Sequence, residues 1–278
     1  MFLKMCEMLR AKSAFAKNTW PADFDGGSCN TSIDFHNRTA AIQFRYYLWR
    51  LFREYWQRFL ASSHTLPIDQ FAWYFVLKHL IWVYELTLVS YNYDFLIESM
   101  LWDIKCHTIH PIVDCVAQMR KRKENDVVVL KPHGCISHAY PIGGAEGAGL
   151  CIVVNSKIET YSVNYNLSDC PSIPDIVPPG HDEAHLANAD SDVAQATGLA
   201  FEHADILVIC GFSSSGPDAI ELEGLLRRSK QIPCVHVGLM RFSDHKGTTA
   251  TLLKRYSSNY QFVDAGSVGL VPSLLDTI

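Results

Sequence analysis

LTLVSYNYD at residues 86–94 and VVVLKPHG at residues 127–134 are the two stretches that decide the fold. Each is a short apolar run that ends in polar residues, which is typical of a buried parallel strand that reaches the edge of a sheet. In open α/β folds, ligands bind outside the carboxyl ends of such strands. We therefore predict one site that contains residues from both stretches, namely Asn92, Asp94 and His133.

The rest of the chain predicts an α/β fold, with a Rossmann-like parallel sheet flanked by helices and an aromatic-rich helical region before it. All six tryptophans lie at or before Trp102, and apolar residues between positions 38 and 62 recur every three or four residues, as on one face of a helix. We expect residues 1–84 to form the helical region, packed on or inserted in the fold, and residues 85–278 to form the parallel-sheet domain.

Helices and strands alternate along the second part of the chain, in the way that βα units do. The predicted helices cover 68–83, 95–104, 111–123, 193–203, 217–229 and 248–256, with one more at the C-terminal end. The predicted strands cover 86–90, 127–130, 150–154, 206–209, 234–237 and 262–263. The stretch over 161–185 is rich in Asn, Ser and Pro, and it predicts a long loop.

Composition and charge place the chain among mildly acidic globular proteins. Its 278 residues are 48% hydrophobic, and 24 Lys and Arg against 29 Asp and Glu leave a net charge of −5. This balance offers no obvious basic face, so we do not expect direct binding to nucleic acid. Charged residues interrupt both the N-terminal segment and the apolar stretch over 71–89, which favours a cytoplasmic protein with no membrane span.

The nine cysteines are scattered along the chain and form no Cys-x-x-Cys pair. Structural zinc sites and disulfide frameworks show paired or regular spacing. We therefore expect reduced thiols, as in a cytoplasmic protein, and no metal site.

A third candidate segment follows the predicted strand over 206–209. Gly211, Ser213 and Ser214 lie between this strand and the next predicted helix, and small residues there allow a ligand to approach the backbone amides. The N-terminus of a helix favours anions because its first N–H groups lack partners within the helix. The segment therefore predicts a pyrophosphate site, although an ordinary tight turn has the same pattern.

The residues after the first two strands have a structural interpretation beside the functional one. Asn92 and Asp94 suit recognition of a sugar hydroxyl and stabilisation of positive charge at an anomeric carbon. Asp94 also suits an Asx turn or the N-cap of the following helix. His133 suits a general base near neutral pH, and it equally suits a hydrogen-bonded histidine in a turn or in the core.

Four motifs occur in an order that resembles a known family. They are YNYD at 91–94, PHG at 132–134, IVPP at 176–179 and ADILVICGFS at 204–213. In this order they resemble the sirtuin-like NAD-hydrolysing domain of bacterial antiphage defence proteins. The resemblance covers about 84–240 in this chain, and it implies a Rossmann-like fold with NAD as the substrate.

The resemblance also assigns roles to individual residues. It implies that Asn92 and His133 are catalytic. The residues expected to bind NAD are Asp94, Gly211, Ser213, Ser214 and Asp218. Sirtuin deacylases carry two Cys-x-x-Cys zinc pairs after the His-Gly motif, and no such pair follows Gly134, so the resemblance implies NAD hydrolysis rather than lysine deacylation. The glycine-rich pyrophosphate loop that begins the family's domain has no counterpart before Asn92.

The expected function is that of a cytoplasmic NAD glycohydrolase, which cleaves NAD to nicotinamide and ADP-ribose. The resemblance implies a gated effector that depletes NAD in antiphage defence by abortive infection. It also implies a homo-oligomer or a complex with a nucleotide-sensing subunit, on which activity depends. The alternative from another class is a non-catalytic subunit that binds a nucleotide and regulates a partner. An NAD-dependent deacylase is the third candidate.

Overall fold

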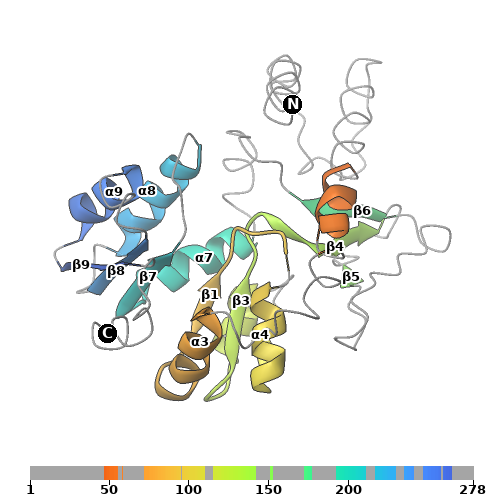
Figure 1. The fold of residues 1–278 in the computed structure, drawn as a ribbon, viewed down its shortest axis with the longest axis horizontal. Helices are drawn as coiled ribbons and strands as arrows, with labels where there is room; N and C mark the ends of the chain where they lie inside the picture. The colour runs from red at the N-terminus through yellow and green to blue at the C-terminus, as the bar shows by residue number, and fades with distance from the viewer. Residues whose placement is uncertain are drawn as a thin grey trace, which may run out of the picture.

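The computed structural model describes residues 47–55, 58, 72–94, 96–109, 115–141, 151–152, 172–176, 192–210, 217–229, 235–240, 247–257 and 259–264. Figure 1 shows their arrangement. The helices are α3 (Ala72–Val83), α4 (Leu96–Ile104), α5 (Cys115–Arg120), α7 (Asp192–Glu202), α8 (Pro217–Ser229) and α9 (Thr248–Tyr256), and residues 47–55 are also helical. The strands are β1 (Thr87–Val89), β2 (Thr108–Ile109), β3 (Val127–Leu130), β4 (Gly134–Pro141), β5 (Cys151–Ile152), β6 (Ser172–Ile176), β7 (Ile206–Cys210), β8 (Val235–Met240) and β9 (Tyr260–Asp264).

The first sheet is parallel and has β3 at its centre. β3 pairs with β1 on one side, where Val89 lies opposite Leu130, and with β2 on the other. All four residues of β3 are buried. Such a run of buried, mostly β-branched residues is typical of a central parallel strand with helices on both faces. The two strands predicted over 86–90 and 127–130 are therefore confirmed as parallel neighbours.

Helices cover both faces of this sheet, because successive residues of β3 point to opposite sides. Val127 and Val129 pack with α3 and α4, whereas Val128 and Leu130 pack with α5 and α7. The buried side chains that α3 and α4 contribute to the cluster with Val127 and Val129 are those of Tyr74, Leu77, Ile81, Met100 and Leu101. The result is three layers in the order α/β/α, with α3 and α4 beside β1 and β3 (Figure 1). The predicted α/β class is thus confirmed.

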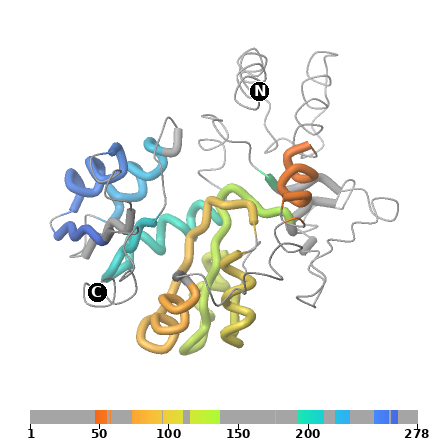
Figure 2. The backbone as a smooth tube through the Cα atoms, viewed as in Figure 1, coloured from red at the N-terminus to blue at the C-terminus, as the bar shows by residue number. Residues whose placement is uncertain are grey.

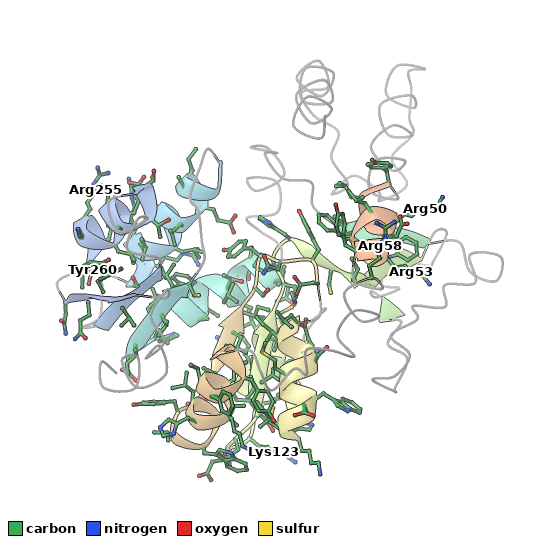
Figure 3. All side chains as sticks on the ribbon, in the orientation of Figure 1. Arg50, Arg53, Arg58, Lys123, Arg255 and Tyr260 are labelled. Atoms are coloured by element: carbon green, nitrogen blue, oxygen red, sulfur yellow. The ribbon has the colours of Figure 1, made fainter. Side chains whose placement is uncertain are left out.

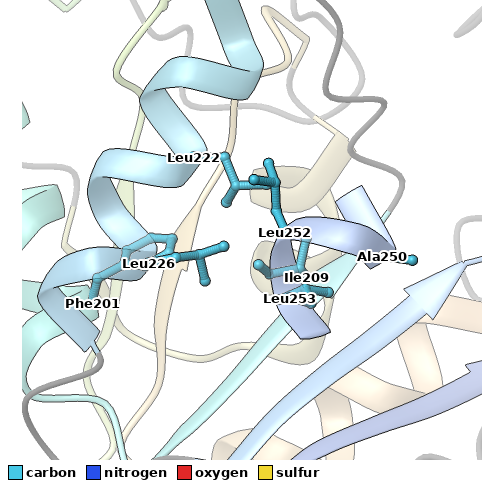
Figure 4. Close-up of a cluster of buried hydrophobic side chains, with 7 residues drawn as sticks. All are labelled: Phe201, Ile209, Leu222, Leu226, Ala250, Leu252 and Leu253. Atoms are coloured by element: carbon cyan, nitrogen blue, oxygen red, sulfur yellow. The ribbon is translucent and has the colours of Figure 1, made fainter. Parts of the chain in front are cut away.

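A second parallel sheet has the strand order β7-β8-β9. α8 and α9 pack on it through a buried cluster that Figure 4 shows in detail: Phe201, Ile209, Leu222, Leu226, Ala250, Leu252 and Leu253. Val89 of β1 packs against the same cluster, so the two parallel sheets share part of one core. α7 contacts both α5 and α8 and runs between the two sheets, as the tube in Figure 2 shows.

An antiparallel sheet continues directly from the end of β3, with the order β5-β4-β6. β6 lies inside the stretch over 161–185, so the prediction that this whole stretch is a loop is wrong. Pro174 in β6 cannot donate a ladder hydrogen bond, which made the local sequence look unlike a strand. It is tolerated opposite Ala139 because β6 is at the edge of this described sheet. Pairing with a distant segment, rather than local propensity, forms the strand.

The helical residues 47–55 are anchored on β4 near its start. The indole Nε1 of Trp49 donates a buried hydrogen bond of 2.7 Å to the carbonyl oxygen of Ile136. The ring of Phe52 lies 4.7 Å from the ring of Tyr93. The basic residues of this region that Figure 3 labels are Arg50, Arg53 and Arg58. The helix predicted between 38 and 62 is confirmed for the part that the structure describes.

The remaining elements agree with the predictions in most places. α8 and α9 have the predicted bounds, and β7, β8 and β9 each overlap a predicted strand. β2 was missed because it has only two residues. The predicted C-terminal helix lies outside the described residues. Within the described parts of the chain, no helix is long and apolar enough to cross a membrane.

Gly224 offers a test of how helical propensity contributes to α8. It lies in the interior of the helix and is exposed, and a Cβ atom built there would meet no other atom within 4 Å. We expect Gly224→Ala to raise the free energy of unfolding by about 0.5–1 kcal/mol, because alanine loses less backbone entropy than glycine in a helix. Urea denaturation measures the change. A decrease in the free energy of unfolding would contradict the prediction, because it would mean that the added methyl group clashes with its surroundings.

Candidate functional site at the ends of β1 and β3

The carboxyl ends of β1 and β3 lie side by side, as the sequence predicts. The backbone N–H of Ser90 donates a hydrogen bond of 2.9 Å to the carbonyl of Leu130, which continues the pairing one residue beyond β1. Residues 91–94 and 131–134 therefore leave the same edge of the sheet, where open α/β folds bind ligands.

A tight turn holds His133 at this edge. The N–H of Gly134 donates a hydrogen bond of 2.9 Å to the carbonyl of Lys131, which closes a four-residue turn. Pro132 occupies the second position of the turn, where its fixed φ is favourable. Gly134 has a φ of 77°, a backbone conformation that side chains with a Cβ atom rarely adopt. The Pro-His-Gly sequence thus has a local structural reason, besides any chemistry that His133 performs.

Three side chains surround the imidazole of His133. The ring of Tyr91 meets it edge-on at 4.8 Å, and the ring of Tyr93 stacks at 6.5 Å between centroids. The Oε2 atom of Glu221, on α8, lies 3.5 Å from the His133 Nε2 atom. The hydroxyl of Tyr91 donates a hydrogen bond of 3.0 Å to Oε1 of the same carboxylate. We call Tyr91, Tyr93, His133 and Glu221 the histidine cluster.

The histidine cluster has the parts of a general base with an orienting carboxylate. A carboxylate beside Nε2 favours the tautomer that carries its proton on Nε2, which leaves Nδ1 as a proton acceptor in the neutral ring. His133 is 6% exposed, so the surrounding side chains have to move before a substrate reaches it.

Glu221, Tyr91 and Tyr93 were not predicted from the sequence as members of the site. Glu221 follows His133 by 88 residues, and only the packing of α8 against the first sheet brings the two together. Tyr91 and Tyr93 lie inside the YNYD motif, in which only Asn92 and Asp94 were predicted to belong to the site. Their alternation with Asn92 could have indicated that the aromatic and the polar side chains take different directions.

Asn92 and Asp94 take different positions at this edge. Asn92 is exposed between the two tyrosines, and its amide is not part of the histidine cluster. The Oδ1 atom of Asp94 accepts a hydrogen bond of 3.0 Å from the N–H of Leu96, in the first turn of α4. A bond from a side chain to the N–H two residues further on is an Asx turn, one of the two structural interpretations that the sequence left open for Asp94.

A buried ion pair lies beneath the loop that carries Asn92. The Lys131 ammonium is 3.0 Å from Oε1 of Glu98, and the two side chains are 3% and 10% exposed. The same ammonium donates hydrogen bonds to the carbonyls of Asn92 at 3.2 Å and Asp94 at 2.8 Å. It also lies 3.4 Å from the hydroxyl of Ser90. Burial lowers the pKa of Lys131, but the charge of Glu98 and other nearby groups outweigh it and hold the pKa above its usual value.

The raised pKa of the buried Glu98 carboxyl makes the free energy of unfolding depend on pH. Burial raises the pKa of the Glu98 carboxyl above its usual value, and the charge of Lys131 opposes this only in part. The folded state therefore binds the Glu98 proton more tightly than the unfolded state does. Stability from this proton is fully present below the usual pKa of 4.5 and is lost as pH rises through the higher pKa of the folded state.

We expect the free energy of unfolding to fall over this pH range relative to that of Glu98→Gln, which has no proton to lose. The slope is at most about 1.4 kcal/mol per pH unit for one group. Urea denaturation of both proteins at several pH values measures the difference. A difference that stays constant with pH would contradict the raised pKa.

The predicted phosphate segment is described only in part. Gly211, Ser213 and Ser214 lie outside the described residues. Asp218 lies in the first turn of α8, but its side chain is outside the description. Among the residues that the structure describes, no group of three or more His, Cys, Asp or Glu side chains is arranged to hold a metal ion.

Comparison with known proteins does not place the chain in a family. No protein-family model matches it, and no curated protein matches it. The sirtuin-like resemblance therefore depends on the four motifs quoted above, and the function has to be argued from the geometry of the site.

Proposed function

We propose that this protein is an NAD glycohydrolase whose active site lies at the carboxyl ends of β1 and β3. The observation that carries the proposal is the position of His133, paired with the carboxylate of Glu221 at the edge where the Asn92 loop also ends. An imidazole can act as the general base, a carboxylate can orient it, and an exposed carboxamide can stabilise charge or orient water, which are roles that hydrolysis of a glycosidic C–N bond can use.

The proposed reaction breaks the bond between the ribose anomeric carbon and the nicotinamide nitrogen. Nicotinamide leaves as a neutral molecule with the bonding electron pair, and positive charge develops on the ribose. The carbonyl oxygen of the Asn92 amide stabilises this charge or orients a water molecule. The water oxygen bonds to the anomeric carbon, and His133 accepts its proton while Glu221 stabilises the resulting imidazolium. The products are nicotinamide and ADP-ribose.

The proposal includes a Rossmann-like fold, in which the sheets β1-β3-β2 and β7-β8-β9 belong to one parallel sheet. Two contacts support it: Val89 packs into the core of the second sheet, and Glu221 on α8 reaches the histidine cluster. Both are expected if β1 and β7 lie next to each other at the centre of one doubly wound sheet. The crevice at such a position is where a dinucleotide binds in folds of this class.

The burial of His133 supports the proposal that a partner controls access to the active site. With its imidazole enclosed by the histidine cluster, the site of the described chain is closed to a dinucleotide. We propose that oligomerisation or a nucleotide-sensing subunit opens it, and that the protein acts in the cytoplasm to deplete NAD during antiphage defence. The helical residues 47–55 connect such a partner to the site, because Phe52 packs on Tyr93.

Measurement of nicotinamide release tests this function directly. Purified protein, alone and with any subunit that co-purifies, is incubated with NAD, and nicotinamide and ADP-ribose are quantified by chromatography. We expect equimolar products, and their loss in Asn92→Ala and His133→Ala variants that remain folded. Release only when an acyl-lysine peptide is added would indicate deacylation instead. Absence of release in both preparations would contradict the proposal.

A non-catalytic nucleotide-binding subunit is the second candidate, and the enclosed position of His133 favours it. A histidine that serves only to hold a turn and pack between two tyrosines needs no access to substrate. This function predicts that ADP-ribose binds in calorimetry while NAD stays intact, with the protein alone and with its partner. It also predicts that His133→Ala lowers the affinity for the nucleotide only as far as it lowers the fraction of folded protein.

A further inference from the structure

The carbonyl oxygens of three successive residues in the loop after β1 all accept hydrogen bonds from the segment over 131–136. The Lys131 ammonium binds the carbonyls of Asn92 and Asp94. The backbone N–H of Ile136 donates a hydrogen bond of 3.1 Å to the carbonyl of Tyr93, between them. These hydrogen bonds fix the backbone at Asn92 from the buried side of the loop. The residue itself is exposed at the edge of the sheet.

The ion pair with Glu98 is not sufficient reason for a lysine at this position. A buried ion pair can often be replaced by two apolar side chains of similar volume without loss of stability. An apolar pair cannot, however, donate hydrogen bonds to two carbonyls that lie two residues apart. The compact ammonium group has three N–H donors, and the acceptors around it are Glu98, the carbonyls of Asn92 and Asp94, and the more distant hydroxyl of Ser90.

We infer that Lys131 is a positioning residue, which holds the backbone of the loop over 90–94 and so keeps the exposed Asn92 at the sheet edge where the histidine cluster also lies. Glu98 acts through Lys131, because it fixes the ammonium from the α4 side at 3.0 Å. Both side chains are buried beneath the loop, so the proposed role is to position the loop rather than to react. The kinetic part of this inference rests on the proposed function, whereas the ordering of the loop does not.

The test uses the double variant Glu98→Met/Lys131→Met, which removes both charges of the pair and so leaves no buried charge without its partner. Hydrogen exchange of the amides over 90–96 is measured first, because it needs no enzymatic activity. We expect exchange there to be about tenfold faster than in the wild type, since the carbonyls of Asn92 and Asp94 lose their donor. Unchanged exchange in the folded double variant would overturn the inference.

A double-mutant cycle with Asn92 then separates positioning from general destabilisation. With Asn92 present, the Met/Met change is expected to lower kcat/KM for NAD about 100-fold, because small displacements of a catalytic group have large effects on rate. In the Asn92→Ala background the same change is expected to lower the residual kcat/KM by about twofold or less, since residues that act as a unit are not additive. Equal losses in both backgrounds would overturn the inference.

Asp126→Ala is the matched control at the opposite end of β3. Asp126 accepts hydrogen bonds from the N–H of Lys123 and from His107, so its loss weakens the same strand away from the site. We expect this variant to keep the exchange over 90–96 and to keep kcat/KM within about twofold. If the wild-type protein releases no nicotinamide, the proposed function fails, and the exchange data alone decide whether Lys131 orders the loop.

Discussion

Glu221→Gln is expected to lower nicotinamide release by about 100-fold or more, which is the usual contribution of general acid–base catalysis. Glutamine keeps the shape of the side chain and can still accept the hydrogen bond from Tyr91. It has no negative charge, so it neither favours the productive tautomer of His133 nor stabilises the imidazolium. The effect should therefore appear in kcat/KM while the free energy of unfolding changes little.

Glu223→Gln is the matched control for this prediction. Glu223 lies two residues further along α8, and its carboxylate accepts hydrogen bonds from Arg227 at 2.9 Å and from Tyr256. These partners belong to α8 and α9, away from His133, so activity should stay within about twofold of the wild type. If Glu221→Gln behaved like Glu223→Gln, the orienting role of Glu221 would be wrong.

Lys131→Met is expected to have the largest effect on stability, a loss of about 3–5 kcal/mol in the free energy of unfolding. The substitution leaves the Glu98 carboxylate buried without its cationic partner, and the loop carbonyls without their donor. Replacing Glu98 by methionine as well removes the buried charge, so the double variant should recover most of the loss.

Urea denaturation of the single and double variants measures both effects. Lys78→Met is the control, because Lys78 is exposed on α3 and its replacement should change the free energy of unfolding by less than about 0.5 kcal/mol. The cost of Lys131→Met should also shrink at low pH, where Glu98 is protonated. A single variant as stable as the control would contradict the account of a buried, charged Lys131.

The fold could be predicted from the sequence wherever local pattern and burial agree. β3 is apolar at every position because helices cover both of its faces, and α8 begins at a proline that suits the first turn of a helix. β6 could not be predicted, because its proline and polar residues form a strand only through pairing with β4. The two-residue β2 gives too short a pattern to identify.

The candidate site was predictable only as far as the ends of two parallel strands determine it. Adjacent strands bring Asn92 and His133 to one edge, and the sequence indicated that arrangement. The sequence pattern of Asp94 suited a ligand-binding residue as well as an Asx turn or a helix cap, and in the structure its side chain forms the Asx turn before α4. Glu221 could not be found because its approach to His133 depends on how α8 packs across the two sheets. Lys131 was missed because a lysine after a strand ordinarily indicates solvent rather than burial.

A crystal structure of the protein with ADP-ribose would test the central claim most directly. We predict that the ribose that carried nicotinamide lies within hydrogen-bond distance of the Asn92 amide and the His133 imidazole, with the Tyr91 side chain moved aside. ADP-ribose bound at any other part of the molecule, with the edge of β1 and β3 left unchanged, would contradict the claim that these strand ends form the dinucleotide site.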